Sequence, residues 1–419
     1  MISHLNISRA RLAMILGALA MLGPFSIDTI FPAFAVMERE LGVGRLAMQQ
    51  TISVYLLGYA GMSLVHGPLS DALGRRPVIL WGIAIFALAS VGCALAESLP
   101  VLLGFRALQG LSAGVGLIVG RAVVRDALQG DDAQRLMSHI SMIFGIAPAI
   151  APIIGGWILG WSNWQAIFWF LTAFALLLMA STAVGLPESH PADARMPMNV
   201  RAMASAYRGI LSSGRFRLLA LAGTANFGAL FLYITSAPAF VLDILGLNEQ
   251  QFGWFFAPTI GGMVLGAYIS GRSAGRVTGV RLANTGFLFC GLSAAFNIAY
   301  NLYVGDGQQQ LPWAVLPTVL SAFGIALVFP ILTLAILDMY PRQRGSASSL
   351  QAFTGLVVNA LIAGVLSPLL SDSGLHLAIG AALFSFVAWA FWRWELQSGA
   401  RIPAGDHEYA AALAPTERL

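Results

Sequence analysis

The stretch Gly67-Pro68-Leu69-Ser70-Asp71-Ala72-Leu73-Gly74-Arg75-Arg76-Pro77 places one acid and two arginines between two apolar segments. Those segments, 46–69 and 77–96, have at least the roughly 20 residues that an α-helix needs to cross a bilayer. Long apolar segments and short polar turns alternate in the same way along the rest of the chain. The pattern predicts an all-α integral membrane protein with twelve transmembrane helices. The predicted spans are 12–36, 46–69, 77–96, 100–121, 136–160, 164–186, 217–241, 250–271, 281–302, 312–337, 346–370 and 375–394.

The composition supports this fold class. Hydrophobic residues make up 58% of the 419 residues and charged residues 10%, against about 45–50% and about 25% in soluble domains. The mean hydropathy of +0.76 is spread over most of the chain, and it is too high for one or two buried cores, because single cores stop growing beyond roughly 250–300 residues. An ordinary soluble protein is therefore excluded.

The arginines indicate how the chain is oriented. The 23 basic residues are all arginine, and 19 acidic residues leave a net charge of +4. An even number of spans puts both termini on one side, and if that side is the cytoplasm, only Arg39 and Arg45 lie outside. By the positive-inside rule, we expect both termini and the 187–216 connection to be cytoplasmic. The inside set is Arg9, Arg11, Arg75, Arg76, Arg121, Arg125, Arg135, Arg195, Arg201, Arg208, Arg215, Arg217, Arg272, Arg276, Arg281, Arg342, Arg344, Arg393, Arg401 and Arg418.

A cleaved signal peptide is the alternative for the first span, since Ala33-Phe34-Ala35 resembles a cleavage site. Cleavage would leave an odd number of spans and spoil the charge pattern. We therefore expect the first span to stay in the protein.

The longest polar connection divides the spans into six and six. The predicted domains are an N-terminal six-helix bundle (1–186), a cytoplasmic linker (187–216), a C-terminal six-helix bundle (217–394) and a cytoplasmic tail (395–419).

The two halves contain an internal repeat. Pro32-Ala33-Phe34 recurs as Pro238-Ala239-Phe240, and at an offset of 204 residues Leu41-Gly42 recurs as Leu245-Gly246, Gly58 as Gly262 and Gly67 as Gly271. Each copy follows an even number of spans, so both have the same orientation. Parallel repeats of this kind predict two six-helix bundles around a central cavity that opens to either side by rocking.

Several motifs stand in a fixed order around the 67–77 loop. They are Gln50–Gly58 (QTISVYLLG), Arg106–Gly110 (RALQG), Arg121–Asp126 (RAVVRD), Pro148–Gly156 (PAIAPIIGG), Leu337–Pro341 (LDMYP) and Gly345–Ser349 (GSASS). On these motifs, essentially the whole chain resembles the major facilitator superfamily, and within it the Bcr/CflA drug-resistance transporters. The chain departs from the family pattern at Met62, Ala72 and Ala151.

The resemblance implies a function. Such proteins are proton-coupled exporters of drugs and other small amphipathic molecules from the bacterial inner membrane. We therefore expect a multidrug efflux protein that exchanges drug for proton, uses the proton gradient and needs no cofactor. Its expected partners are a small-molecule substrate, protons and the lipid bilayer, and we expect a monomer. The alternative is a proton-coupled exporter or importer of a natural metabolite such as a siderophore or an amino acid.

Two ionisable groups lie deep in the predicted spans, Asp28 in span 1 and Arg106 in span 4. Burial in lipid disfavours a charged carboxylate, so an acid there is functional by default. Pro24 and Pro32 flank Asp28 and loosen the helix around it. We expect Asp28 to carry the proton, with Arg106 acting on a nearby acid or holding a polar network with Gln109. The alternative is a permanent Asp28–Arg106 ion pair that only stabilises the bundle.

The polar loop at 67–77 is the candidate gate. Asp71 can meet the positive N-terminal end of span 11, or it can pair with Arg121 or Arg125; a solvated turn is the alternative. The second copy, Gly271–Arg276, has lost the aspartate. The resemblance assigns gating to Gly67, Asp71, Gly74, Arg75, Arg76, Arg121 and Arg125.

Two further sets of residues are candidates for function. The resemblance identifies an antiporter-type motif in span 5 at Pro148, Pro152, Gly155 and Gly156, where glycines allow close helix approach. Polar and aromatic side chains within spans are candidates for lining a drug pocket, with packing as the alternative for each. They are Tyr55, Tyr59, Gln109, Asn226, Tyr233, Asn297, Tyr300 and Asn359.

Other function classes lack their motifs. A chain without lysine cannot contain the GxxxxGK[ST] loop of an ATP-driven pump. An enzyme is not expected, since HExxH is absent. The histidines, Cys93 and Cys290 show no ligand spacing, so no metal is expected. Arginines in small groups between apolar segments do not resemble a nucleic-acid-binding surface. A channel is a third possible class of protein, and saturable transport coupled to proton movement would exclude it.

Overall fold

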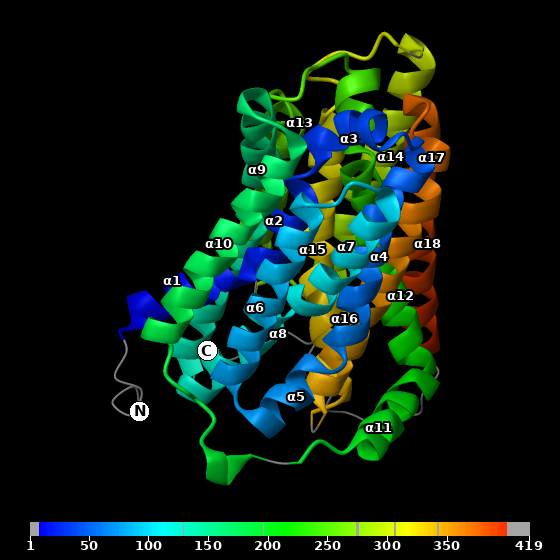
Figure 1. Ribbon diagram of the computed structural model, residues 1–419. Coiled ribbons are helices and arrows are strands. Elements are labelled where there is room, and N and C mark those ends of the chain that lie inside the picture. Colours follow the sequence, from blue (N-terminus) through cyan, green and yellow to red (C-terminus); the bar gives the residue numbers. More distant parts are fainter. Residues whose placement is uncertain are drawn as a thin grey trace. The chain divides into compact units, whose positions relative to one another are not determined.

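The computed structural model describes residues 8–128, 130–195, 197–273, 276–305, 307–341 and 343–399. Within these ranges every regular element is a helix (Figure 1), so the predicted all-α fold is confirmed. Residues 400–419 of the predicted tail, and Arg342, Arg401 and Arg418 of the inside set, lie outside the described residues.

The chain divides into two compact units, residues 1–202 with 248–253 and residues 203–247 with 254–419. The division near residue 202 falls within the predicted linker, and the domain boundaries stay a prediction. The linker contains a short 3₁₀-helix, η3 (Ala192–Ala194), and the helix α11 (Val200–Ser212), which the sequence analysis did not predict.

The first unit contains the first six predicted spans. Its helices are α1 (Arg9–Ala20), α2 (Leu22–Asp28), the 3₁₀-helix η2 (Phe31–Ala33), α3 (Phe34–Leu41), α4 (Arg45–Ser63), α5 (His66–Leu73), α6 (Arg75–Ala94), α7 (Leu99–Ala113), α8 (Val115–Ala127), α9 (Gly130–Trp161) and α10 (Trp164–Gly185).

The second unit contains the other six. Its helices are α12 (Gly214–Thr235), the π-helix η4 (Ala239–Ile244), α13 (Gly253–Ser273), α14 (Gly279–Val304), α15 (Leu316–Met339), α16 (Arg344–Leu361), the π-helix η5 (Ile362–Leu366), α17 (Ser367–Leu370) and α18 (Gly374–Gly399). The last helix continues five residues past the predicted end of span 12 at residue 394.

In the described part of the chain, fewer segments than the twelve predicted spans meet the length and hydropathy of a membrane crossing. Every predicted span lies on a helix or on consecutive helices. By length and hydropathy, ten segments among the described residues qualify as membrane spans, and the bent pair α4–α5, with an angle of 49°, would make eleven. The helix α13 is long enough to span a membrane at 21 residues. Its glycines and polar residues lower its mean hydropathy below that of the ten qualifying segments. A multi-pass membrane protein is confirmed, and the count of twelve stays a prediction.

The first span is broken at the two positions where its prolines act. Pro24 has no N–H for the carbonyl of Ala20, and Pro32 has none for the carbonyl of Asp28. Correspondingly, α1 ends at Ala20 and α2 ends at Asp28. The expectation that these prolines loosen the span is confirmed, and the break leaves Asp28 at a helix end inside the first unit.

Two pairs of glycines show the internal repeat in three dimensions. Gly42 and Gly246 both end a helical segment in the left-handed conformation, with φ of 66° and 62°. A Cβ on Gly58 would lie 2.7 Å from a carbonyl oxygen of α7, and one on Gly262 would lie 2.4 Å from a carbonyl oxygen of α15. Equivalent glycines therefore allow equivalent helix contacts in the two units.

Candidate functional site

Asp28 is a buried acid at the C-terminal end of α2. The residue is 4% exposed. Its carboxyl group makes neither a hydrogen bond nor an ion pair with a described residue. Next to it, the Thr29 hydroxyl donates to the carbonyl of Phe25. Burying a carboxyl group without a partner has the smallest free-energy cost when the group is protonated, because the neutral form loses less hydration.

Arg106 is fully buried and is held by neutral acceptors. Its Nη1 donates to the carbonyl of Ser26 at 3.0 Å, to Ser26 Oγ at 2.9 Å and to Gln109 Oε1 at 2.7 Å. Its Nε donates to the carbonyl of Thr51 at 3.3 Å, and the guanidinium lies 4.5 Å from the centre of the Tyr55 ring. Its Nη2 has no partner among the described residues. The arginine thus ties together α2, α4 and α7 with one donor group left over.

Asp28 and Arg106 do not pair in this structure. Ser26, which contacts Arg106, lies two residues before Asp28 on α2. The Nη1 and Nε groups of Arg106 are occupied by neutral acceptors, and no ion pair joins Arg106 to Asp28 among the described residues. The permanent ion pair considered as an alternative is therefore not formed, and Arg106 holds a polar network with Gln109, as the sequence analysis also allowed.

Two of the predicted pocket residues belong to this network. Gln109 Nε2 donates to Ser90 Oγ at 2.7 Å, and Tyr55, which is buried, donates from its hydroxyl to the carbonyl of Gly23 at 3.3 Å. Tyr59 is half-buried, and a Cβ on Gly114 would lie 2.4 Å from its ring. Tyr55 and Gln109 therefore support Arg106, and Tyr59 packs against Gly114 at the junction of α7 and α8.

The loop at 67–77 forms a cluster of charges around Arg75. Arg75 Nη1 lies 2.5 Å from Asp71 Oδ1, and its Nε lies 2.9 Å from Asp126 Oδ2. Its Nη1 also donates to Ser70 Oγ at 2.7 Å. Arg75 is buried although it carries a charge, and two carboxylates compensate for the water it has lost.

The expected partners of Asp71 require a correction. Asp71 pairs with Arg75, and neither Arg121 nor Arg125 makes an ion pair with a described residue. Both arginines lie on α8, whereas Arg75 is only four residues along the chain from Asp71 and is closer. Gly67, in the first turn of α5, faces open space. The contact of Asp71 with span 11 stays a prediction.

Glu188, at the start of the linker, caps helix α6. Its Oε1 accepts from the backbone N–H of Arg75 at 3.0 Å, and its Oε2 accepts from the backbone N–H of Arg76 at 3.2 Å. A carboxylate at a helix N-terminus satisfies free N–H groups and faces the positive end of the helix dipole. Gly74 allows this approach: its φ is 100°, and a Cβ there would lie 2.6 Å from Glu188 Oε2. Arg195 adds a long ion pair with Glu188 at 4.0 Å.

Sequence reasoning named neither Glu188 nor Asp126 as a functional residue. Asp126 was quoted only within the RAVVRD motif, and Glu188 follows the last apolar residues of span 6 without any motif. Ser189 Oγ donates to Asp126 Oδ2 at 3.2 Å, and Arg76 Nη2 donates to the carbonyl of Ala183 at 2.5 Å. The sequence signal that could have found them is charge. Both acids follow apolar segments, and such acids are candidates for binding the arginine pair Arg75-Arg76.

The span-5 motif packs beside the break that contains Asp28. Pro148 and Pro152 lie inside α9. A Cβ on Gly155 would lie 1.9 Å from the carbonyl oxygen of Thr29, and one on Gly156 would lie 2.1 Å from the carbonyl oxygen of Glu249. Only glycine allows backbones this close, so Gly155 brings α9 against the residue that follows Asp28.

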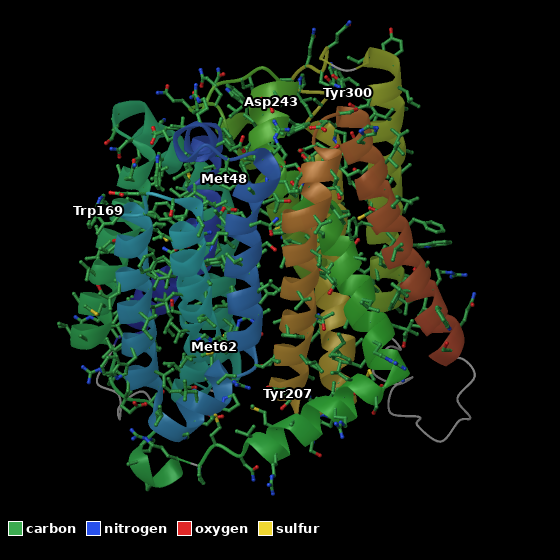
Figure 2. The ribbon with its side chains drawn as sticks, turned by 45° about the vertical axis from the view of Figure 1, so that its right-hand side comes forward. Met48, Met62, Trp169, Tyr207, Asp243 and Tyr300 are labelled. Atoms are coloured by element: carbon green, nitrogen blue, oxygen red, sulfur yellow. The ribbon has the colours of Figure 1, made fainter. Side chains whose placement is uncertain are left out.

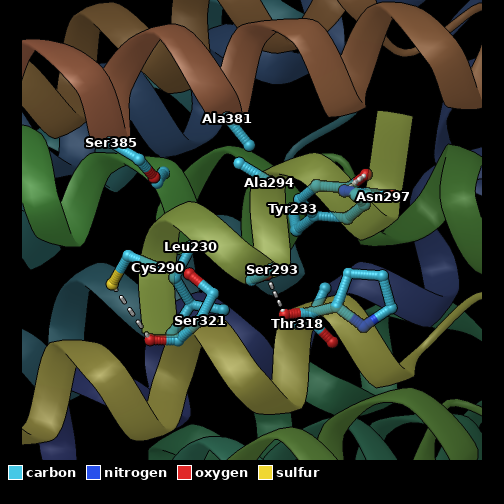
Figure 3. A pocket seen from close by; sticks show the side chains of 12 residues that line it. Leu230, Tyr233, Cys290, Ser293, Ala294, Asn297, Thr318, Ser321, Ala381 and Ser385 are labelled. Atoms are coloured by element: carbon cyan, nitrogen blue, oxygen red, sulfur yellow. Dashed lines mark hydrogen bonds between the residues drawn. The ribbon is translucent and has the colours of Figure 1, made fainter. Parts of the chain in front are cut away.

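The candidates in the second unit separate into three groups. Asn297 Nδ2 donates to the Tyr233 hydroxyl at 2.8 Å, and both line a small cavity between α12, α14, α15 and α18 (Figure 3). Asn226 Oδ1 accepts from the Cys290 thiol at 3.6 Å. Asn359, on α16, is buried, and its Oδ1 has no partner among the described residues.

Tyr300 contacts the connection that follows its own helix, and its place in a drug pocket stays a prediction. Its hydroxyl accepts from the backbone N–H of Gln310 at 2.9 Å, in the connection between α14 and α15. It lies near one end of the second unit, opposite the end where Tyr207 of α11 lies (Figure 2). Tyr300 lies near the C-terminal end of α14, and its hydroxyl anchors the connection to α15.

No metal site is formed by the described residues: no group of three or more His, Cys, Asp or Glu side chains comes together among them.

Residues 15–363 match the family model of the Major Facilitator Superfamily. The chain is 28% identical to Multidrug resistance protein D of Escherichia coli strain K12, over 87% of this chain and 90% of that one. It is 27% identical to the Bicyclomycin resistance protein homolog of Haemophilus influenzae, over 85% and 89%. Among solved structures, a bacterial homologue of the human lysosomal transporter Spinster is 17% identical, with a TM-score of 0.72 over 94% of this chain and 99% of that one. This last likeness concerns the fold alone.

Proposed function

The chain belongs to the Major Facilitator Superfamily, and we propose that it is a drug:proton antiporter that exports small amphipathic compounds across the bacterial inner membrane. As a member of this family it is a transporter and not an enzyme. The observation that carries the proposal is Asp28, a buried acid in a broken span that has no hydrogen bond or ion pair with a described residue. The chain's relatives include proteins named for bicyclomycin and multidrug resistance.

Asp28 is the proposed proton carrier. A charged carboxylate in the middle of a bilayer costs at least about 2.5–3.5 kcal/mol, so this acid holds a proton while it is closed off from water. When the break after α2 opens to water, the proton can leave, and the negative charge can then attract a cationic or polar substrate. Inward proton flow is in this way exchanged for outward substrate flow.

Arg106 is the proposed organiser of this site. Its positive charge is fixed, since a guanidinium does not lose its proton, and its contacts with Ser26 hold one face of α2. A turn of α2 about its axis would bring Asp28 toward the free Nη2 group. The resulting pair would favour the charged form of Asp28, and the present arrangement leaves that form unsupported.

The charged cluster around Arg75 is the proposed gate, with Asp71, Asp126 and Glu188 as its acids. Breaking charge-assisted contacts of this kind costs about 1.5–3 kcal/mol each, which is enough to change the balance between two states. We propose that the two six-helix units, 1–186 and 217–394, act as the moving domains, and that both termini and the linker are cytoplasmic. Support for this orientation comes from the distribution of the arginines.

The test is proton release in everted vesicles or proteoliposomes that carry a pH-sensitive dye. A panel of amphipathic compounds, including bicyclomycin, is added to wild-type protein, to Asp28→Asn and to Asp193→Asn. Asp193 is an exposed acid of the linker and provides a matched control. We expect proton release through wild-type protein and Asp193→Asn and none through Asp28→Asn, which keeps the neutral shape of the protonated acid. Full proton-driven accumulation by Asp28→Asn would sink the assignment.

A further inference from the structure

One face of α14 carries four polar residues into the interior of the second unit. Cys290, Ser293, Asn297 and Asn301 recur at intervals of three and four residues, which places them on one side of a helix. All four are buried. In a membrane-spanning bundle, such groups find hydrogen-bond partners only inside the protein.

The stripe connects α14 to its neighbours through hydrogen bonds. Asn297 Nδ2 donates to the Tyr233 hydroxyl of α12 at 2.8 Å, and Asn301 Nδ2 donates to the carbonyl of Asn297 at 2.8 Å. Ser293 Oγ donates to the carbonyl of Pro317 on α15 at 2.5 Å. Every group in this ladder is neutral, so it holds helices together without carrying charge.

A small cavity lies beside the ladder, as Figure 3 shows. Its volume of about 10 Å³ is at the lower limit of what a cavity needs to hold one water molecule. Its walls come from α12, α14, α15 and α18, and small apolar side chains such as Ala381 fill part of them. The polar groups in its walls are Tyr233, Ser293, Asn297, Thr318, Ser321 and Ser385.

The cavity offers the two to four partners that a buried water needs. The Tyr233 hydroxyl accepts from Asn297 and has no described acceptor for its own proton. The Ser293 hydroxyl gives its proton to Pro317 and keeps its lone pairs. Ser385 is 7% exposed and makes no hydrogen bond with a described residue. One donor, one acceptor and one hydroxyl that can be either therefore face the same small space.

We propose that this cavity is a binding site for one water molecule, held by Tyr233, Ser293 and Ser385. The water completes the hydrogen bonds of three helices in the second unit, α12, α14 and α18. Tyr233 and Asn297 then serve this internal site and not the substrate pocket for which the sequence suggested them. The inference is independent of the proposed transport function, since it concerns the interior of a single unit.

The two cysteines provide a built-in test. X-ray radiolysis converts a bound water into hydroxyl radicals where it stands, and a thiol beside it is oxidised even when bulk solvent cannot reach it. Cys290 lines the cavity. Cys93 is equally buried, at 0% exposed, and donates to Gln109 Oε1 at 3.7 Å in the first unit. In the full-length protein in lipid nanodiscs, mass spectrometry should find oxidised Cys290 and unmodified Cys93.

Filling the cavity should abolish the signal. Ser385→Val and Ala381→Val each add methyl groups to the α18 wall, so the result does not depend on the folding of one variant. We expect the loss of Cys290 oxidation in both, with Cys93 unchanged. Equal oxidation of the two thiols, none at Cys290, or oxidation that persists in the filled variants overturns the proposal. So does labelling of Cys290 by N-ethylmaleimide, which is too large for the cavity and would report an open route from bulk solvent.

Discussion

The two units bury polar side chains in different ways. In the first unit, the fully buried Arg106 collects neutral acceptors from three helices while Asp28 remains without a partner among the described residues. In the second unit, Tyr233, Asn297 and Asn301 form a ladder without any charge. Both networks connect helices, but only the first contains groups whose charge can change or must be compensated.

The internal repeat sharpens this contrast. At the offset of the repeat, Asp28 corresponds to the segment 232–234, which includes Tyr233. The acid lies at the end of a short helix and has no partner in the described part of the chain, whereas the tyrosine belongs to a continuous helix and its hydroxyl accepts a hydrogen bond from Asn297. The two copies therefore differ at this place: the first contains a buried acid, and the second contains a hydrogen-bonded tyrosine.

The largest effect is expected for Arg106→Lys. A lysine keeps the charge but cannot reach Ser26, Thr51 and Gln109 together, because it lacks the planar fork of a guanidinium. Losing about two hydrogen bonds to a charged group should lower stability by roughly 3–6 kcal/mol. Thermal unfolding of the purified protein in detergent measures this loss. A drop in Tm no larger than that of a ladder variant such as Tyr233→Phe would show that charge does not set the first network apart.

A smaller effect is expected for Glu188→Gln. The amide can still accept a hydrogen bond, but the charge that faces the N-terminus of α6 is removed, at a cost of about 0.3–2 kcal/mol. We expect drug efflux to slow by roughly two- to thirtyfold with little change in protein level. Efflux rates of a fluorescent substrate in cells provide the measurement.

Glu97→Gln is the matched control for this variant, because Glu97 is exposed and lies outside the cluster. Equal efflux rates for the two variants would mean that Glu188 only fills a loop.

The smallest effect is expected for Tyr233→Phe. It removes one hydrogen bond of the ladder, and such bonds in membrane proteins average about 0.6 kcal/mol and reach about 1.7 kcal/mol. We expect a modest decrease in Tm and unchanged proton coupling in the proteoliposome assay. Loss of coupling in this variant would break the comparison, since it would give the second unit a part in proton transfer.

The sequence was sufficient to find the residues whose chemistry is rare in lipid. Asp28 and Arg106 stood out because ionisable groups within spans are costly, and the break in span 1 followed from the lack of N–H groups on Pro24 and Pro32. The family assignment rested on ordered motifs and is confirmed. These inferences depend on local chemistry, which a single sequence displays.

The partners of those residues could not be predicted in the same way. Glu188 caps a helix 113 residues away from it in sequence, and Asp126 meets Arg75 across 51 residues. Tyr300 was expected to line a pocket, and its hydroxyl binds the backbone of Gln310 in the connection after α14. The helix α11 and the cavity beside Cys290 were not predicted at all, since neither has a motif.

The sequence by itself therefore determined that this protein lies in a membrane, where its helical segments are, that it contains a repeat, and which ionisable residues lie within spans. Hydropathy and charge are properties of each residue and can be read without the fold. Only the tertiary structure decided that Arg106 donates to Ser26 and Gln109 and forms no described ion pair with Asp28, that Asp71 pairs with Arg75, and that Tyr233 lines a cavity of its own unit. Those choices depend on the angles at which helices meet and on which side chain arrives within about 3 Å. A list of residues along one chain does not contain either.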